Sequence, residues 1–233
     1  MKRGWLALNA VTVSLMVFTL ATASMAATGT SKPQEVVNGA LTTLNHFMAD
    51  PDFSWFRSHV KEAKAVLIMP RLYKGAFFVG GAGGNAVLLV RDEKTGEWSQ
   101  PAFFTIGSAS FGLQFGGQAS EVILMVMTPK GIESLYTSSF KLGADASVAA
   151  GPVGAGVEGA TAPNLSADYL SFARSKGAFI GVSLEGAVIA ARDEYNATYY
   201  GKPVRPVDIL VKADVSNPRA AKLRQALAEA AKR

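Results

Sequence analysis

The sequence predicts an α+β fold in which helices at the amino and carboxyl ends cover a strongly curved, barrel-like, mostly antiparallel sheet. Three observations predict it. Apolar residues recur at helical spacing before residue 63 and after residue 217. Between them, short β-branched and aromatic runs alternate with Gly, Pro or charged residues, as strands do. Glycine also occupies many of these strand positions, and a glycine-rich strand favours a sharp bend.

Residues 1–26 have the three-part layout of a secretory signal peptide. Lys2 and Arg3 precede an apolar stretch, and small residues end it at Ala26 and Ala27. An uncleaved anchor is the alternative, but the apolar run is shorter than the roughly 20 residues that a spanning helix needs. We therefore expect an exported protein, in the periplasm or peripheral to an envelope membrane. The chain has no cysteine for a disulfide or a lipid anchor.

Residues 27–63 are expected to form an amphipathic helical lead that packs on a single domain, residues 64–233. Ser31-Lys32-Pro33-Gln34 has the spacing of a capping box and predicts a helix that runs to about Ala49. Asp50-Pro51-Asp52 then breaks this helix, and Asp52 is expected to cap a second, short one.

The strand pattern begins at Ala65 with the runs AVLIM, GAFFVGG and NAVLLV. Residues 92–96 (DEKTG) indicate a hairpin loop. Large side chains at Phe111, Leu113 and Phe115 would share one face of a later strand. Val122–Met127 is a continuous apolar run, which indicates a strand buried on both faces.

The second half of the chain predicts a short helix near residues 130–136 and a helix after Asn217-Pro218. Leu223 and Leu227 form a narrow apolar stripe on the last helix, so we expect it to pack weakly. Four further strands are expected between these helices, near residues 141–151, 153–160, 166–176 and 177–191.

Two glycine patterns resemble a dinucleotide fingerprint, at residues 81–86 and 154–159. That motif requires a helix after the last glycine, but a strand-like run follows the first pattern and Ala-Thr-Ala-Pro the second. Both are interpreted as turns. The only histidines, His46 and His59, lie far in sequence from the serine-rich strands and form no HExxH motif. We expect no catalytic centre, no metal and no cofactor.

Residues Lys64 to Gly201 carry a set of distinctive stretches in order: KAVLIMP, GGAGGNAVLLVRD, WSQPAFFTIGSASFGLQFGGQASEVILMVMT, KLGADASVAAGPVGAG and YLSFARSKGAFIGVSLEGAVIAARDEYNATYYG. In these stretches the chain resembles the SYLF lipid-binding family. The resemblance implies non-enzymatic binding of anionic phospholipids, with phosphoinositides the class for eukaryotic members. If the chain is bacterial, as its leader suggests, phosphatidylglycerol or cardiolipin is the expected class.

A lipid site of this kind needs cations for the headgroup phosphate and apolar surface for the acyl chains, and the amphipathic helices with neighbouring basic residues are expected to supply both. The same cations could instead form ordinary solvated helix faces. For a second group, surface pairs with Asp145 or Asp168 are an equal alternative. The first candidates are Lys61, Lys64, Arg71 and Lys74, and the second group is Lys141, Arg174 and Lys176.

The expected partner is therefore an anionic phospholipid or a membrane surface. Nucleic acid is not expected, because no nucleic-acid motif surrounds the basic and aromatic residues at 71–74. The alternative is a structural or protein-interaction component of the periplasm. The sequence carries no signature of oligomeric state.

Overall fold

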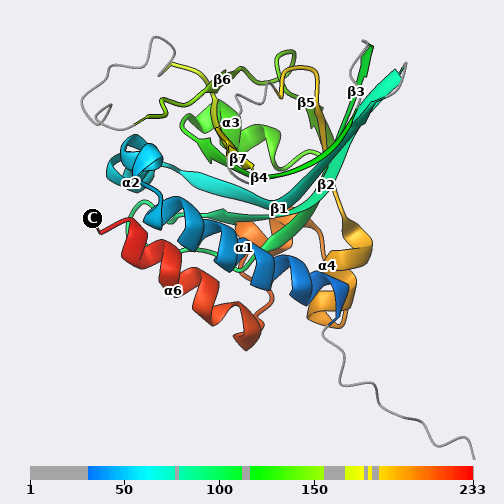
Figure 1. The fold of residues 1–233 in the computed structure, drawn as a ribbon. Coiled ribbons are helices and arrows are strands. Elements are labelled where there is room, and N and C mark those ends of the chain that lie inside the picture. Colours follow the sequence, from blue (N-terminus) through cyan, green and yellow to red (C-terminus); the bar gives the residue numbers. More distant parts are fainter. Residues whose placement is uncertain are drawn as a thin grey trace, which may run out of the picture.

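The computed structural model describes residues 31–76, 79–111, 116–154, 166–175, 178–179 and 184–232. Helical elements open the chain and return at its end (Figure 1). The helical elements are α1 (Lys32–Ala49), η1 (Pro51–Phe53), α2 (Ser54–His59), η2 (Val60–Glu62), α3 (Pro129–Ser134), α4 (Asp193–Tyr200), α5 (Pro206–Leu210), η3 (Pro218–Ala220) and α6 (Ala221–Ala230). The strands are β1 (Ala65–Ala76), β2 (Val79–Val90), β3 (Ala102–Phe111), β4 (Gly116–Val126), β5 (Ser139–Lys141), β6 (Val148–Ala150), β7 (Tyr169–Ser175), β8 (Ala178–Phe179) and β9 (Val188–Ala191).

One curled sheet joins these strands in the order β5-β9-β3-β2-β1-β4-β7-β6, with β8 paired to β7. Within the described part of the chain the strand pairs are antiparallel, apart from the parallel pair of β6 and β7. Figure 1 shows α1 and α6 on one face of the sheet and α3 across the other. The predicted α+β fold with a strongly curved sheet and terminal helices is confirmed.

The face under α1 is closed by the apolar side of that helix. Val37, Leu44 and Phe47 are almost completely buried and recur at helical spacing. The predicted capping box is wrong, however, because the Ser31 side chain makes no cap hydrogen bond and Gln34 instead donates to Asn38.

The residue that caps the turn after α1 lies two positions before the expected one. Asp50, rather than Asp52, accepts a hydrogen bond at the start of η1, from the backbone N–H of Asp52 at 3.1 Å. The last helix also differs from its prediction, because Leu223 and Leu227 are fully buried beside α1 rather than weakly packed. The apolar sides of α1 and α6 therefore pack on the same face of the sheet and complete the apolar layer there.

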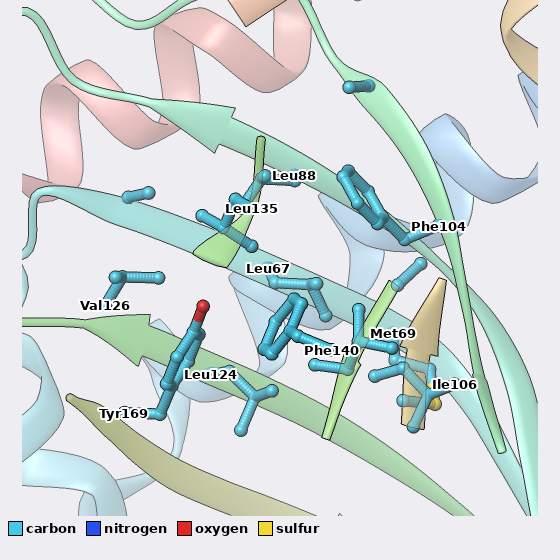
Figure 2. Packing of buried hydrophobic residues seen from close by; sticks show 14 of the residues in the cluster. Leu67, Met69, Leu88, Phe104, Ile106, Leu124, Val126, Leu135, Phe140 and Tyr169 are labelled. Atoms are coloured by element: carbon cyan, nitrogen blue, oxygen red, sulfur yellow. The ribbon is translucent and has the colours of Figure 1, made fainter. Parts of the chain in front are cut away.

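The opposite face holds a second apolar cluster that the sheet curls around (Figure 2). Alternate residues of β4, Val122, Leu124 and Val126, point into this cluster, whereas Ile123 and Met125 belong to the layer under α1. The prediction of a central strand buried on both faces is therefore confirmed. Figure 2 shows how side chains from different strands converge there: Leu67, Met69, Leu88, Phe104, Ile106, Leu124, Phe140 and Tyr169.

Several local predictions need correction. Residues 81–86 lie inside β2 rather than in a turn. The expected strand at 141–151 is divided between β5 and β6, with a turn at residues 143–145 between them. Of residues 153–160, the described ones, 153–154, are not strand, and the rest lie outside the described residues, as do residues 112–115. The expected strand at 177–191 contains a turn at Glu185 and Gly186, and α4 and α5 were not foreseen.

Candidate functional site

A groove of about 750 Å³ opens between the first turns of α1, strands β1 to β3 and the start of α4. Three cations line it, and each comes from a different element: Lys32 from α1, Arg71 from β1 and Arg192 from the junction of β9 and α4. Glu35 is the one carboxylate in the lining. We name this feature the basic groove; its remaining lining residues are Val36, Gly39, Pro70, Tyr73, Gly83, Gly84, Asn85, Thr105 and Tyr195.

A β-bulge places Arg71 in this groove. Between Met69 and Leu72, the two residues Pro70 and Arg71 stand opposite the single residue Glu121 of β4. Met69 and Leu72 both point into the cluster on the side away from α1, so the extra residue leaves Pro70 and Arg71 together on the groove side. Regular alternation from Met69 would have turned Arg71 to the other face.

Glycine lets neighbouring elements approach this bulge closely. A Cβ on Gly84 would lie 2.3 Å from the backbone oxygen of Arg71, and one on Gly39 would lie 2.8 Å from Cβ of Pro70. Both contacts are too short for any side chain to fit without movement. The glycine-rich run in β2 therefore accommodates the bulge instead of forming a turn.

Arg192 is held rigidly on the far wall of the groove. Its guanidinium carbon lies 3.8 Å from the centre of the Tyr195 ring, and Nη1 donates a hydrogen bond to Oδ1 of Asn85. Its backbone N–H donates to the carbonyl of Phe103 at 2.8 Å. An arginine stacked and bonded in this way loses little entropy when an anion binds it.

Tyr73 adds an exposed aromatic ring to the same groove. It is 56% exposed, the largest exposed fraction among the large apolar side chains of the described residues. A tyrosine of this kind suits the boundary between water and lipid, where its ring and its hydroxyl meet different surroundings. The groove thus combines cations, one acid and an amphipathic ring.

The four cations that the sequence analysis names as first candidates, Lys61, Lys64, Arg71 and Lys74, do not form one patch. Lys61 and Lys64 precede β1, and Lys74 lies near its far end, so the Cα atoms of Lys64 and Lys74 are separated by roughly 30 Å at the rise of a strand. Lys61 is exposed, whereas the ammonium of Lys64 pairs with Glu93. Of these four residues, Arg71 alone lines the basic groove.

Lys74 lies on the face away from Arg71. It alternates with Leu72, and its partner Ala82 on β2 packs against the cluster on the side away from α1. Partial burial lowers the pKa of Lys74 from its ordinary value, because desolvation disfavours the charged ammonium. Its environment therefore differs from that of Arg71 although the two residues are close in sequence.

The second group of candidates is also dispersed. Lys141 is exposed at the end of β5, and its backbone N–H, rather than its ammonium, donates to Asp145 at 2.7 Å. Arg174 is paired with neither Asp145 nor Asp168; instead Nε lies 3.0 Å from Oδ2 of Asp50 and Nη1 lies 3.1 Å from Oε2 of Glu121. Lys176 lies outside the described residues.

Arg174 belongs to a compensated cluster at the carboxyl half of α1. Glu121 also accepts from Thr43 at 3.2 Å and lies 2.8 Å from Nδ1 of His46. The hydrogen bond with Asp50, followed by the interactions with Glu121, raises the pKa of Arg174. We name Thr43, His46, Asp50, Glu121 and Arg174 the clamp cluster; it ties α1 to β4 and β7.

The expectation that the amphipathic helices offer apolar surface to lipid is wrong in this structure. The apolar side of α1 covers the sheet, and Trp55 and Phe56 of α2 are fully buried in the same layer. The exposed side of α1 is polar. The exposed ring beside the groove cations is that of Tyr73, which comes from β1 and not from these helices.

The sequence-based candidates omitted Lys32 and Arg192. Lys32 lies within the motif that was interpreted only as a helix cap, and Arg192 lies in the last of the family-like stretches, directly after an apolar strand. They approach Arg71 through α1 packing on the β1 bulge and through β9 pairing with β3. One signal in the sequence could have indicated Arg192: it follows an apolar strand and precedes a helix whose third residue, Tyr195, is aromatic.

The described residues contain neither a metal-site cluster nor a membrane-spanning helix. No group of three or more His, Cys, Asp or Glu side chains there has the arrangement of a metal site. No helix in the same part of the chain is long and apolar enough to cross a membrane. The second histidine, His59, is held by its own helix, where Nδ1 lies 2.9 Å from the carbonyl of Trp55.

The fold and the groove define the class of this protein: a curled sheet with helical cover and a basic, aromatic-edged surface groove. Residues 107–230, more than half of the chain, match the family described as Ysc84, Las17-binding protein actin regulator. The chain belongs to this family, whose domain is also called SYLF, and the resemblance found in the sequence is thereby confirmed.

The relatives that match are eukaryotic proteins of greater length. SH3 domain-containing YSC84-like protein 1 of Bos taurus is 30% identical over 160 residues, 68% of this chain and 46% of that protein. Its Homo sapiens counterpart is 31% identical over 152 residues, 65% of this chain and 44% of that protein. LAS seventeen-binding protein 3 of Saccharomyces cerevisiae is 32% identical over 145 residues, 61% of this chain and 31% of that protein. The chain thus spans less than half the length of these relatives.

Proposed function

We propose that the protein binds anionic phospholipid at a membrane surface through the basic groove, and that it catalyses no reaction. One observation carries the proposal: cations from three separate elements converge on one groove, beside the exposed ring of Tyr73. Each Lys or Arg near an anionic membrane contributes about 1 kcal/mol to binding. Three such residues opposed by one carboxylate give a modest, salt-sensitive affinity.

The arrangement of the groove supports a headgroup site rather than a diffuse charged face. Arg192 is fixed by Tyr195 and Asn85, so its guanidinium group keeps its position before a phosphate arrives. The bulge sets the backbone position of Arg71 on the same groove. The half-exposed position of Tyr73 lets its ring enter the interfacial layer while the cations contact the headgroup.

Flotation of the purified protein with liposomes tests this function. We expect flotation with vesicles that contain phosphatidylglycerol, cardiolipin or phosphoinositide, and none with neutral phosphatidylcholine vesicles. Raising the salt from low to moderate concentration should weaken flotation, because screening shortens the range of the surface field. Equal flotation with neutral and anionic vesicles, or no flotation with any vesicle, would contradict the proposal.

We further propose that the chain is exported and acts at the envelope, because residues 1–26 have the signal-peptide layout. Mass spectrometry of the protein recovered from its native cells tests this. A mature amino terminus next to Ala26 is expected. A protein that keeps its first residues and fractionates with the cytoplasm would contradict export.

Protein interaction is the second candidate function. The description of the family, which names Las17 binding and actin regulation, favours it. Sedimentation of the protein with purified actin filaments in the absence of lipid would support this candidate. A protein that stays in the supernatant under conditions where it floats with anionic vesicles would leave lipid binding as the better account.

A further inference from the structure

A second groove, of about 600 Å³, lies between the β2–β3 hairpin, α5 and α6. It has no lining residue in common with the basic groove. We name it the hairpin groove, and the residues that matter for its chemistry are Arg91, Trp98, Tyr136, Leu210, Val211 and Arg224. A space of this size is in the range that holds small organic ligands.

The mouth of the hairpin groove exposes apolar side chains. Val211 is 55% exposed and Tyr136 is 40% exposed, which makes them two of the four large apolar side chains that are exposed in the described residues. Leu210 and Val215 are buried behind them and line the same groove. Such apolar surface beside a concave space is typical of a binding site.

Two donor atoms lie beneath the hairpin side of the groove and lack acceptors. Nε1 of Trp98 and Nε of Arg91 are shielded from solvent and have no hydrogen-bond partner among the described residues. Such groups are rare in folded proteins, because a buried donor without a partner is destabilising. Within the same residues, Arg91 and Arg224 form no ion pair; their hydrogen bonds go to neutral carbonyls, of Lys61 at 2.5 Å and of Trp98 at 2.7 Å.

The two acids in the lining, Asp92 and Glu97, form no ion pair with these arginines in the described part of the chain. Oδ1 of Asp92 accepts from the backbone N–H groups of Lys94 and Thr95, both at 2.8 Å, so this carboxylate is engaged in its own turn. Glu97 is exposed. Each of the two guanidinium groups in the lining, of Arg91 and Arg224, therefore lacks a carboxylate partner among the described residues.

The backbone at the opposite wall is strained. Ala213 has a φ of +54°, and it is the residue other than glycine with a positive φ in the described part of the chain. Side chains disfavour this region, and such strain concentrates at ligand-binding segments. Exposed apolar groups, donors without acceptors and backbone strain thus occur around one groove.

We propose that the hairpin groove binds a small amphiphilic carboxylate, such as a medium-chain fatty acid. The carboxylate would form ion pairs with the guanidinium groups of Arg91 and Arg224, and the alkyl chain would cover Val211, Leu210 and Tyr136. A charged acceptor fits two unpaired guanidinium groups better than a neutral carbonyl does. The proposal is independent of phospholipid binding at the basic groove.

Isothermal titration of the protein with sodium decanoate, below its micellar concentration, tests the proposal. Decanoate should bind, and decanol, which has the chain without the charge, should bind at least tenfold more weakly. Val211→Asp places a negative charge at the mouth without disturbing the core, and it should weaken decanoate binding at least tenfold. Val188→Asp, at an exposed position outside the groove, should change it less than twofold.

Three results would overturn this assignment: no binding of decanoate by the folded protein, equal binding of decanol, or unchanged binding by Val211→Asp. The variant Lys32→Gln/Arg71→Gln separates the two grooves. It should bind decanoate within twofold of the unmodified protein, and a large loss would place the carboxylate in the basic groove instead. The Val211→Asp variant should float with vesicles as the unmodified protein does. The two experiments therefore test carboxylate binding at the hairpin groove and phospholipid binding at the basic groove separately.

Discussion

The two ends of α1 carry similar residue types and have opposite electrostatic character. At its first turns, Lys32, Arg71 and Arg192 face open space with one acid among them. At its last turns, Arg174 is bound by Asp50 and Glu121. Both arginines on the sheet, Arg71 and Arg174, lie on the side that α1 covers. The difference teaches that the acids around a cation, rather than its place in the sequence, determine whether it is available to a ligand.

The bulge places Arg71 in the basic groove, and Gly84→Ala should disrupt this bulge. The added Cβ would overlap the backbone oxygen of Arg71, which cannot move aside as a flexible side chain would. We expect a loss of about 3 kcal/mol in the free energy of unfolding, measured by urea denaturation. Gly107→Ala is the matched control, because a Cβ there meets nothing within 4 Å. Equal stability of the two variants would contradict the role assigned to Gly84.

A buried carboxylate outside both regions gives the next largest effect. Burial alone would raise the pKa of Asp168, but hydrogen bonds from Thr128 and Ser147 hold it below its ordinary value. Asp168→Asn keeps one acceptor oxygen and replaces the other by a donor that faces Ser147 or Thr128. It should cost about 2 kcal/mol at neutral pH, measured by urea denaturation.

The pH dependence of stability follows from the same pKa shift. A carboxyl whose pKa is lowered by folding stabilises the folded state above its unfolded pKa of about 4, and this contribution is lost as the pH falls through the folded value. The unfolding free energy of the unmodified protein should therefore decrease below about pH 4. The unfolding free energy of the Asp168→Asn variant should decrease less steeply in this pH range. Parallel plots of unfolding free energy against pH for the two proteins would contradict the lowered pKa of Asp168.

The clamp cluster predicts a smaller effect. Glu121→Gln keeps an oxygen for Thr43 but removes the charge that faces Arg174 and His46. These groups are partly exposed, so solvent screening limits the expected loss in the free energy of unfolding to about 1 kcal/mol. Urea denaturation would show this loss as a lower midpoint. Glu62→Gln, at an exposed position, is the control and should leave the midpoint unchanged. A clamp variant as stable as this control would show that the cluster does not hold α1.

Local patterns predicted the elements that depend on near neighbours. The helix from residue 32 to 49, the loop at residues 92–96 and the doubly buried run in β4 follow from apolar spacing and turn chemistry. The glycine-rich strand positions predicted the curled sheet, and the family-like stretches predicted the family. These features need no knowledge of which strands pair.

The basic groove could not be predicted in the same way, because pairing over long separations creates it. Arg192 reaches the groove after β9 pairs with β3, and Arg71 turns toward it only because β1 has one residue more than β4 at the bulge. Local spacing grouped Arg71 with Lys74, which lies on the other face. Sequence proximity therefore predicted the right kind of residue and the wrong set of partners.

The most direct test of the account compares two variants in flotation with vesicles of phosphatidylcholine and phosphatidylglycerol at low salt. Lys32→Gln/Arg71→Gln removes two groove cations worth about 1 kcal/mol each, so it should weaken vesicle affinity about 30-fold. Lys94→Gln/Lys222→Gln removes two exposed charges elsewhere, and Arg174→Gln removes the clamped arginine; each should change the affinity less than threefold. Equal losses in all three variants, or a larger loss in Arg174→Gln, would contradict the central claim that the basic groove is the lipid site.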